Sequence, residues 1–382
     1  MGNTIESISS PAQAMQKPFV LCAQATGYGP ASKLLVIAEI LAASGLPCLF
    51  MGRGIAFELA RRSPGFAEIV EAEASSARAR KIVASASGVL SVMDVDFASL
   101  ALGSSKPLFV VDSLAWMRRP LPAAFLSARR YWVQDFPGLR AHLAGTSPMP
   151  CIIGPIVSET GVSPPTSPAK IVVCLGGYET PYARSDDDSG YTRFVIRGLL
   201  HSGLAEAFDG RLLVMGGARC VERLSHEYEE CGVRFVSLSH REAALVRSGA
   251  EVLLTAPGLT STLECFRSGR PTFFLPPQNY SQWLILNRLR EAGLAPCSFH
   301  WQDHLPGGSF APVWTMAERV PIVRRAIGRV TADPAAQRDY LEGLKQILKV
   351  PKADLSHKQR EFFDSLGPNG AVTIAEELTA FL

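Results

Sequence analysis

The sequence lacks the features that mark a membrane protein or a nucleic-acid-binding protein. No apolar run approaches the roughly 20 residues that a membrane-spanning helix needs, and residues 1–17 are polar, without the apolar centre of a signal peptide. The formal net charge is only +3, too small to indicate binding to nucleic acid or to an anionic membrane surface. We therefore expect a cytoplasmic protein with no nucleic-acid partner and no integral membrane segment; peripheral membrane contact stays open.

Cysteines at metal-binding or redox spacing are also absent. None of the eight cysteines belongs to a C-x-x-C motif, and several fall inside apolar segments. They are Cys22, Cys48, Cys151, Cys174, Cys220, Cys231, Cys265 and Cys297. The pattern predicts reduced thiols in the core of the protein, as is usual in the cytoplasm.

The histidines and acidic runs do not indicate a metal site. His300 and His304 are four residues apart, a spacing suited to zinc on a helix, but Pro296 and Pro306 favour a loop and no third ligand is evident. Contact of either histidine with a diphosphate or a sugar is the better hypothesis for this pair. The acidic run 186–188 lies among Gly, Ser and Arg and is expected to be a solvated loop. We predict no metal.

Length and composition indicate a two-domain globular protein. Hydrophobic residues make up 47% and charged residues 19% of the 382 residues, which excludes wholesale disorder, and this length is typical of two domains. A stretch rich in Pro, Ser, Thr and Gly marks a linker at residues 156–169. We therefore predict a disordered N-terminus (1–17), a first domain (18–155) and a second domain (170–382).

The first domain begins as a strand, a glycine turn and a helix. Residues 18–25 form a continuous apolar strand that leads into the turn 26–30 and a helix over 31–44, the opening unit of a doubly wound parallel sheet. Further strands are predicted at 47–51, 88–93, 107–111, 131–133 and 151–153. Asp94 and Asp96 follow one of these strands and Asp112 another, at the edge where ligands of such sheets bind.

The second domain opens in the same way. An apolar strand at 170–175 leads into Gly176, Gly177 and Tyr178, a turn suited to contact with phosphate or sugar. Further strands are predicted at 211–215, 233–236, 252–255 and 272–275, and C-terminal helices at 320–331, 334–348 and from 358 to the end. Both halves of the chain are thus predicted to be α/β.

Residues 250–295 carry the densest set of ligand-binding side chains. Hydroxyls stand at the start of a helix predicted from Thr260, where free N–H groups and the macrodipole favour an anion, and Glu264 is suited to accept hydrogen bonds from a ribose diol. The complete set is Gly258, Thr260, Ser261, Thr262 and Glu264, followed after the next strand by Gln278, Asn279 and Gln282. Phosphate, ribose and further hydroxyls in series describe a nucleotide-sugar site.

This stretch resembles the donor-binding signature of the GT-B glycosyltransferases, especially the UDP-glycosyltransferase and MurG-type families. The matching residues are Gly258, Ser261-Thr262-Leu263-Glu264, Gly269-Arg270-Pro271, Gln282 and Asn287. Two positions depart from the pattern: Ala256-Pro257 replaces a histidine and a glycine, and Ser281 replaces an aspartate.

The resemblance implies a fold and a function. The fold would be α/β, a GT-B arrangement of two Rossmann-like doubly wound domains facing a central cleft, with the last helix packed back on the first domain. The function would be metal-independent, inverting transfer of a sugar from a nucleotide-diphosphate sugar, UDP-linked by expectation, to a small-molecule or lipid-linked acceptor. The nucleotide sugar is a co-substrate, and no cofactor is expected. Gly27, Tyr28 and Gly29 would face the acceptor, and Leu238 would lie beside the nucleobase.

The chain has no histidine before His142, so its first glycine loop lacks the imidazole that serves as the base in UDP-glycosyltransferases. Asp94, Asp96 and Asp112 are the alternative candidates for the base, although aspartates at strand ends often only cap a turn or a helix. Trp116, with the two arginines that follow it, either lines an acceptor groove or belongs to a surface loop.

Three functional hypotheses therefore stay open: a glycosyltransferase, a nucleotide-sugar hydrolase or epimerase on the same fold, and a non-catalytic nucleotide-sugar-binding protein.

Overall fold

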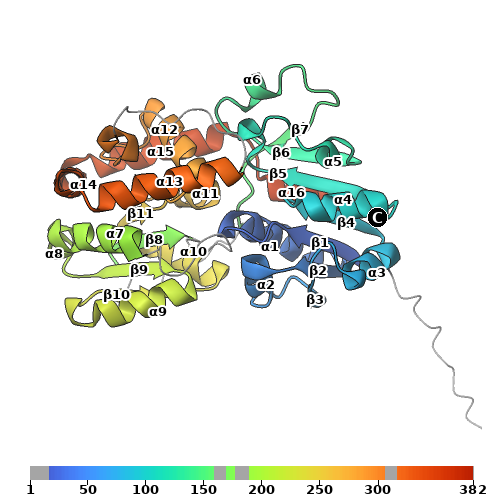
Figure 1. Cartoon of the computed structure of the whole chain (residues 1–382), viewed down its shortest axis with the longest axis horizontal. Helices are drawn as coiled ribbons and strands as arrows, with labels where there is room; N and C mark the ends of the chain where they lie inside the picture. The colour runs from blue at the N-terminus through green and yellow to red at the C-terminus, as the bar shows by residue number, and fades with distance from the viewer. Residues whose placement is uncertain (1–16, 159–168, 177–188, 306–315, 382) are drawn as a thin grey trace, which may run out of the picture.

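The computed structural model describes residues 17–158, 169–176, 189–305 and 316–381 and contains two parallel β-sheets, one in each half of the chain (Figure 1). The first sheet has the strand order β3-β2-β1-β4-β5-β6-β7 and the second the order β10-β9-β8-β11-β12. All the strand pairs are parallel. The predicted α/β class with two Rossmann-like doubly wound units is confirmed.

The first half of the chain alternates strands and helices around buried apolar strands. The strands are β1 (Phe19–Ala23), β2 (Cys48–Gly52), β3 (Glu68–Glu71), β4 (Gly88–Val92), β5 (Leu108–Asp112), β6 (Arg130–Gln134) and β7 (Cys151–Ile153). The helices are α1 (Tyr28–Ala43), α2 (Gly54–Ala60), α3 (Ala77–Ser85), α4 (Val95–Gly103), α5 (Ala123–Leu126) and α6 (Leu139–Leu143). Every residue of β1, β2, β4 and β5 is buried, which explains their unbroken apolar sequences.

The second half repeats this arrangement and adds a helical C-terminus. The strands are β8 (Ile171–Gly176), β9 (Leu212–Gly216), β10 (Arg234–Val236), β11 (Val252–Thr255) and β12 (Thr272–Phe274). The helices are α7 (Ser189–His201), α8 (Leu204–Ala207), α9 (Ala218–Glu227), α10 (His240–Gly249), α11 (Leu259–Arg267), α12 (Tyr280–Glu291), α13 (Met316–Thr331), α14 (Pro334–Gln346), α15 (Lys352–Ser365) and α16 (Gly370–Phe381).

Three local features differ from the sequence-based expectations. The helix expected from residue 358 to the end is two helices, α15 and α16, separated by residues 366–369. The edge strand β3 was not predicted, because its sequence EIVE is short and largely solvent-accessible and carries little periodic signal. Helix α1 begins at Tyr28, three residues before the expected start. Gly27 has a φ of 73°, which turns the chain directly into the helix, and Pro30 is tolerated because it lies in the first turn.

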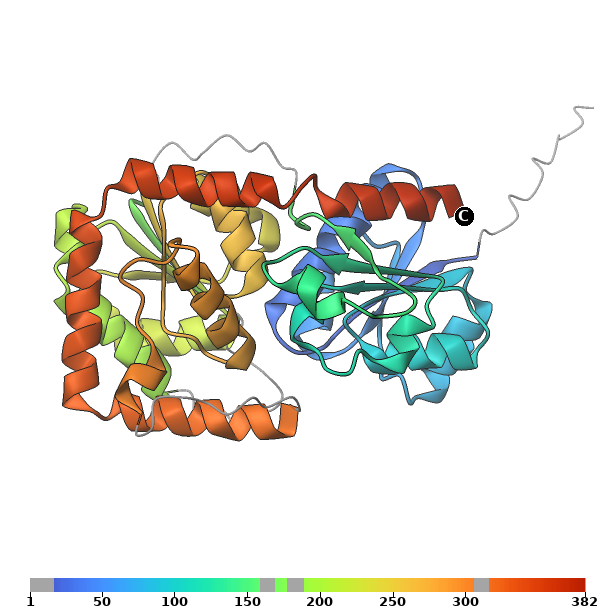
Figure 2. The same cartoon turned by 90° about the horizontal axis from the view of Figure 1, so that it is seen from above.

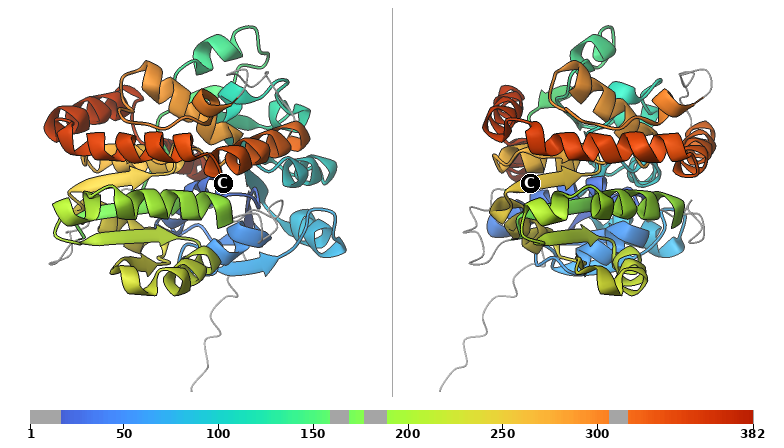
Figure 3. Two further views of the ribbon diagram at one scale, coloured as in Figure 1. Left: turned by 60° about the vertical axis from the view of Figure 1, so that its left-hand side comes forward. Right: turned by 90° about the vertical axis from the view of Figure 1, so that its left-hand side faces the viewer.

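The C-terminal helices return to the first sheet. Helix α14 packs beside α7, through stacked rings of Phe194 and Tyr340, at the end of the second domain remote from the first (Figures 2 and 3). The chain then crosses back through α15, and α16 lies against α1, with the Phe381 ring 4.9 Å from that of Phe109. Asn369 bonds the backbone of Val157 in the outgoing connection, so the two crossings lie side by side.

Strand order places one topological switch point in each sheet. Crossovers run in opposite directions on either side of β1 and β4 in the first sheet, and of β8 and β11 in the second. Ligands of open α/β sheets bind beyond the carboxyl ends of the strands at such points. A functional site is therefore expected at these two positions.

Candidate functional site

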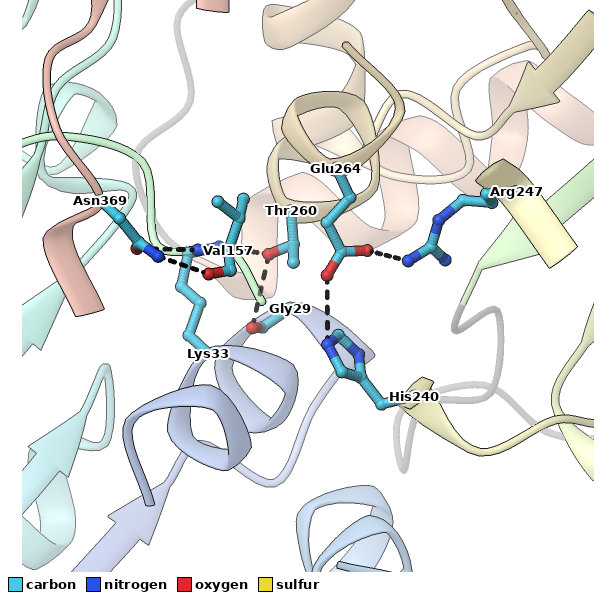
Figure 4. A network of polar contacts seen from close by, with 8 residues as sticks. All are labelled: Gly29, Lys33, Val157, His240, Arg247, Thr260, Glu264 and Asn369. Carbon is cyan, nitrogen blue, oxygen red and sulfur yellow. Dashed lines mark hydrogen bonds and ion pairs between the residues drawn. The ribbon is translucent and has the colours of Figure 1, made fainter. Parts of the chain in front are cut away.

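The two switch points meet where helices α1 and α11 begin. Thr260 in the first turn of α11 receives a hydrogen bond from the Lys33 ammonium of α1, and its Oγ1 lies 3.5 Å from the carbonyl oxygen of Gly29 (Figure 4). A Cβ atom at Gly29 would lie 3.3 Å from Thr260 Oγ1, so the close approach of the helices depends on glycine at that position. The glycine turn of the first domain and the donor stretch of the second are thus in direct contact.

Lys33 is the residue of this contact that sequence analysis missed. Its side chain is 1% exposed, and burial lowers the pKa of its ammonium to about 8 against the opposing attraction of Glu264. Within the part of the chain that the structure describes, its only hydrogen bond goes to Thr260 and no carboxylate forms an ion pair with it. A sequence signal existed: Lys33 is the one charged residue in the buried run 30–38 of α1.

Glu264 lies between two basic side chains of α10. Its Oε2 is 2.7 Å from Arg247 Nη2, and its Oε1 is 3.3 Å from His240 Nε2 without the alignment of a hydrogen bond. Burial opposes ionisation of the carboxyl, but the positive charges of Arg247, His240 and Lys33 outweigh it, so the pKa of Glu264 lies below its usual value. Glu264 is therefore a buried carboxylate with one oxygen still free to accept a hydrogen bond.

Three amide side chains that follow β12 form hydrogen bonds at the second switch point: Gln278, Asn279 and Gln282. Gln278 donates to the carbonyl of Leu175 in β8, and the Gln278 N–H donates to Gln282 Oε1 at 2.8 Å. Asn279 caps α12 by accepting from the Gln282 N–H at 3.0 Å. Because Gln278 also lies beside Gly176, these residues join the ends of β8 and β12 around the start of α11. Their positions agree with a shared site, and Asn279 has in addition the ordinary role of a cap.

The remaining donor-side candidates have different surroundings. The Thr262 hydroxyl is buried and has no hydrogen-bond partner among the described residues, whereas Ser261 is partly exposed. Leu238 is partly buried and packs against the core of the second domain. Gly177 and Tyr178 lie outside the described residues, as does the acidic run 186–188. Gly258 is the N-cap residue of α11, and no side chain caps this helix.

Asp94 stands at the first switch point, two residues after the end of β4. Its Oδ1 accepts hydrogen bonds from the N–H groups of Asp96 and Phe97, so it caps α4. Burial raises the pKa of its carboxyl, against the opposing hydrogen bond from the Phe97 N–H. The preceding Met93 has a φ of 62°, unusual for a residue other than glycine and a form of strain that clusters at functional sites. Capping uses one carboxylate oxygen, and Oδ2 accepts no bond among the described residues.

The structure argues against Asp112 and Asp96 as the catalytic base. Asp112 is fully buried: its Oδ2 pairs with Arg118 Nε at 2.8 Å and accepts from the Tyr131 hydroxyl at 3.3 Å, and its Oδ1 accepts from the backbone. A carboxylate so completely bonded has no position from which to receive an acceptor proton. Asp96 is an exposed residue in the first turn of α4.

Trp116 does not line an open groove. It is 4% exposed, packs against Phe136 at a ring distance of 5.3 Å, and lies beneath the guanidinium of Arg288, which comes from α12 of the second domain. Neither the groove nor the surface loop considered for this residue is correct, because the indole is part of the contact between the domains. Tyr28 is the first residue of α1 and is partly exposed.

The two histidines near residue 300 are structural. His300 is 1% exposed, burial lowers the pKa of its imidazole to about 4, and its Nε2 lies 3.1 Å from the Ser298 hydroxyl. His304 stacks on the ring of Phe299 at 5.0 Å. No group of three His, Cys, Asp or Glu residues suited to a metal ion occurs in the described part of the chain. Among these same residues, no helix is long and apolar enough to span a membrane.

Comparison with solved structures identifies the architecture. MurG of Acinetobacter baumannii has a similar structure, with a TM-score of 0.51 and 12% sequence identity over 95% of this chain and 99% of that one. The calicheamicin glycosyltransferase CalG4 has a TM-score of 0.51 and 14% identity, over 96% and 98% of the two chains. The chain therefore has the GT-B fold that the donor stretch predicted.

No protein-family profile matches the chain, and no curated protein is similar to it in sequence. At 12–14% identity the two similarities define the fold and leave the activity to be argued from the site.

Proposed function

We propose that the protein is a glycosyltransferase that uses a nucleotide-diphosphate sugar as donor. The observation that carries this proposal is the contact of the two switch points, where a helix start, Thr260, Glu264 and Lys33 converge between two Rossmann-like domains. The GT-B fold of CalG4, which is described as a glycosyltransferase, supports the same conclusion by analogy. In this proposal the first domain binds the acceptor and the second binds the donor.

The donor would lie along the second switch point. The first three N–H groups of α11 have no intrahelical acceptor and no side-chain cap, and the helix dipole favours the diphosphate there. Glu264 Oε1, which has no hydrogen bond, would accept from a ribose hydroxyl. The nucleobase would contact the segment around Leu238, and the sugar would approach Gln278 and Gln282. We take UDP as the nucleotide because the donor stretch resembles that of UDP-dependent enzymes.

Asp94 is the proposed general base. Its free oxygen would accept the proton of the acceptor hydroxyl as the acceptor oxygen bonds to the anomeric carbon and the bond from that carbon to the diphosphate breaks. The nucleoside diphosphate leaves with the bonding electron pair, and its charge is stabilised by the start of α11. One direct displacement of this kind inverts the anomeric centre. No step requires a metal, because the helix start and basic side chains supply the positive charge.

Binding of nucleoside diphosphates tests the proposal first. We expect UDP, or one of dTDP, GDP and ADP in its place, to raise the melting temperature of the purified protein, since a ligand that binds only the folded state stabilises it by mass action; at 100 times Kd this amounts to about 2.7 kcal/mol. Turnover of the matching nucleotide sugar should persist in EDTA. No thermal shift with any of the four would contradict the proposal, and sugar released without an acceptor would indicate a hydrolase.

Glu264→Gln tests the ribose contact. The variant keeps the size of the side chain but replaces the charged acceptor, so nucleotide binding should weaken by about 1–3 kcal/mol. It also removes the charge that balances buried Arg247, and we expect a loss of folding stability of about 3–5 kcal/mol. Isothermal titration with UDP below the melting temperature of the variant separates the two effects. Unchanged affinity would remove Glu264 from the site.

A further inference from the structure

We propose that Lys33 of the first domain binds the diphosphate of the donor held by the second domain. The inference rests on the proposed function and adds to it a residue from the opposite domain that distinguishes a nucleoside diphosphate from a nucleoside.

The polar network around Glu264 contains more positive than negative charge. Arg247, 7% exposed, pairs with Glu264, while the buried Lys33 has no carboxylate partner among the described residues. Even with His240 neutral, two cations surround one carboxylate. An ammonium that is buried without a counter-ion destabilises the folded protein unless an anion joins it. The network is therefore one negative group short, and a phosphate would supply that charge.

The ammonium is positioned at the start of a helix that has no cap of its own. Lys33 donates to Thr260, the second residue of α11, and Gly258 before it carries no side chain to cap the first turn. Figure 4 shows the Lys33 side chain reaching Thr260 in this first turn, whose N–H groups have no intrahelical acceptor. The Thr262 hydroxyl, two residues further along α11, is also fully buried and has no partner among the described residues.

In this inference Lys33 takes the place of a basic side chain that the resembled signature has and this chain lacks. Ala256 occupies the position where the donor signature has a histidine, so no basic group of the second domain stands at that point of the chain. Lys33 reaches the same helix start from α1 instead. A donor phosphate bound there would contact both domains, and transfer of the sugar would be coupled to their contact through α1 and α11.

Titration calorimetry with UDP and uridine tests the inference. In the wild type we expect UDP to bind far more tightly than uridine, and in Lys33→Met the affinity for UDP should fall about 10- to 100-fold, the usual loss when a charged hydrogen bond is removed. Uridine affinity should not change. Lys33→Gln, which keeps a polar side chain without charge, should behave like Lys33→Met. Lys81→Met, at an exposed lysine of α3, is the matched control and should bind both ligands as the wild type does.

Three other outcomes would each contradict the inference. If wild type binds UDP and both Lys33 variants bind it equally well, the inference is wrong and the proposed function stands. If the variants lose uridine and UDP binding in equal proportion, Lys33 only maintains the domain contact, and the inference is again wrong. A wild type that binds neither UDP nor uridine, nor the other nucleoside diphosphates, contradicts the proposed function together with the inference.

Discussion

Asp94→Asn is expected to lower kcat about 100- to 10,000-fold, the range for loss of a general base, with little change in folding stability. Asparagine is as good an N-cap as aspartate, so the hydrogen bonds to the N–H groups of Asp96 and Phe97 should persist. Donor affinity should also stay unchanged, because Asp94 lies on the acceptor side. Steady-state kinetics with the best-binding nucleotide sugar, together with a thermal melt of the variant, measure both effects.

Two companion variants separate chemistry from structure. Asp94→Ala should lose the same activity and in addition about 1 kcal/mol of stability, since alanine cannot cap α4. Asp112→Asn should lower the folding stability but leave the activity of the folded protein unchanged. It leaves Arg118 without its buried partner and should destabilise the protein by about 3–5 kcal/mol, while the folded fraction keeps its kcat. Full activity in Asp94→Asn would contradict its assignment as the base.

Lys33→Met should make the protein more stable at neutral pH. Burial lowers the pKa of Lys33 to about 8 from a usual value of 10.5, which corresponds to about 3 kcal/mol of unfavourable free energy for the charged form in the folded state. Loss of the hydrogen bond to Thr260 offsets part of the gain. We expect a net stabilisation of about 2 kcal/mol at pH 7, measured by denaturant unfolding.

The pH dependence of this difference has a defined sign. Below pH 8 the lysine is charged in both the folded and the unfolded protein, so the wild type carries the full penalty. Between pH 8 and 10.5 the folded protein releases its proton while the unfolded chain keeps it, so the stability of the wild type rises relative to the variant. Above this window the advantage of methionine should be gone. Lys81→Met should show no such pH-dependent difference, and a flat difference for Lys33→Met would contradict a buried, charged Lys33.

A Lys33 variant that gains stability and loses donor affinity would show that the buried lysine serves ligand binding at the expense of folding stability. Residues that serve a site are often unfavourable for folding, and their replacement by apolar residues commonly stabilises a protein at the expense of function. Lys33 fits that description because it is 1% exposed and its ammonium donates only to Thr260 among the described residues.

Local patterns allowed the sequence to predict most of the fold, including the position of α11. The apolar strands with glycine turns gave both sheets, and the order of Gly258, Ser261, Thr262 and Glu264 located the start of α11, because these features depend on neighbours in sequence. The edge strand β3 was missed because four residues of mixed polarity carry no distinctive pattern.

The polar network could not be predicted because it joins distant segments. Lys33 and Thr260 are separated by 227 residues, and Arg247 and His240 reach Glu264 from a different helix. Asp112 was considered a base for the same reason: its partners Arg118 and Tyr131 become visible only when β5 and β6 are paired. The sequence shows that a carboxylate lies at a strand end, but not whether other side chains already pair with it.

Hydrogen–deuterium exchange, with and without the nucleoside diphosphate that gives the largest thermal shift, tests whether the ligand binds where α1 and α11 meet. We expect slower exchange in two segments on opposite domains, residues 27–34 and 258–265, because bound phosphate would contact the starts of both helices. Protection confined to other segments, or no protection on binding, would contradict this expectation.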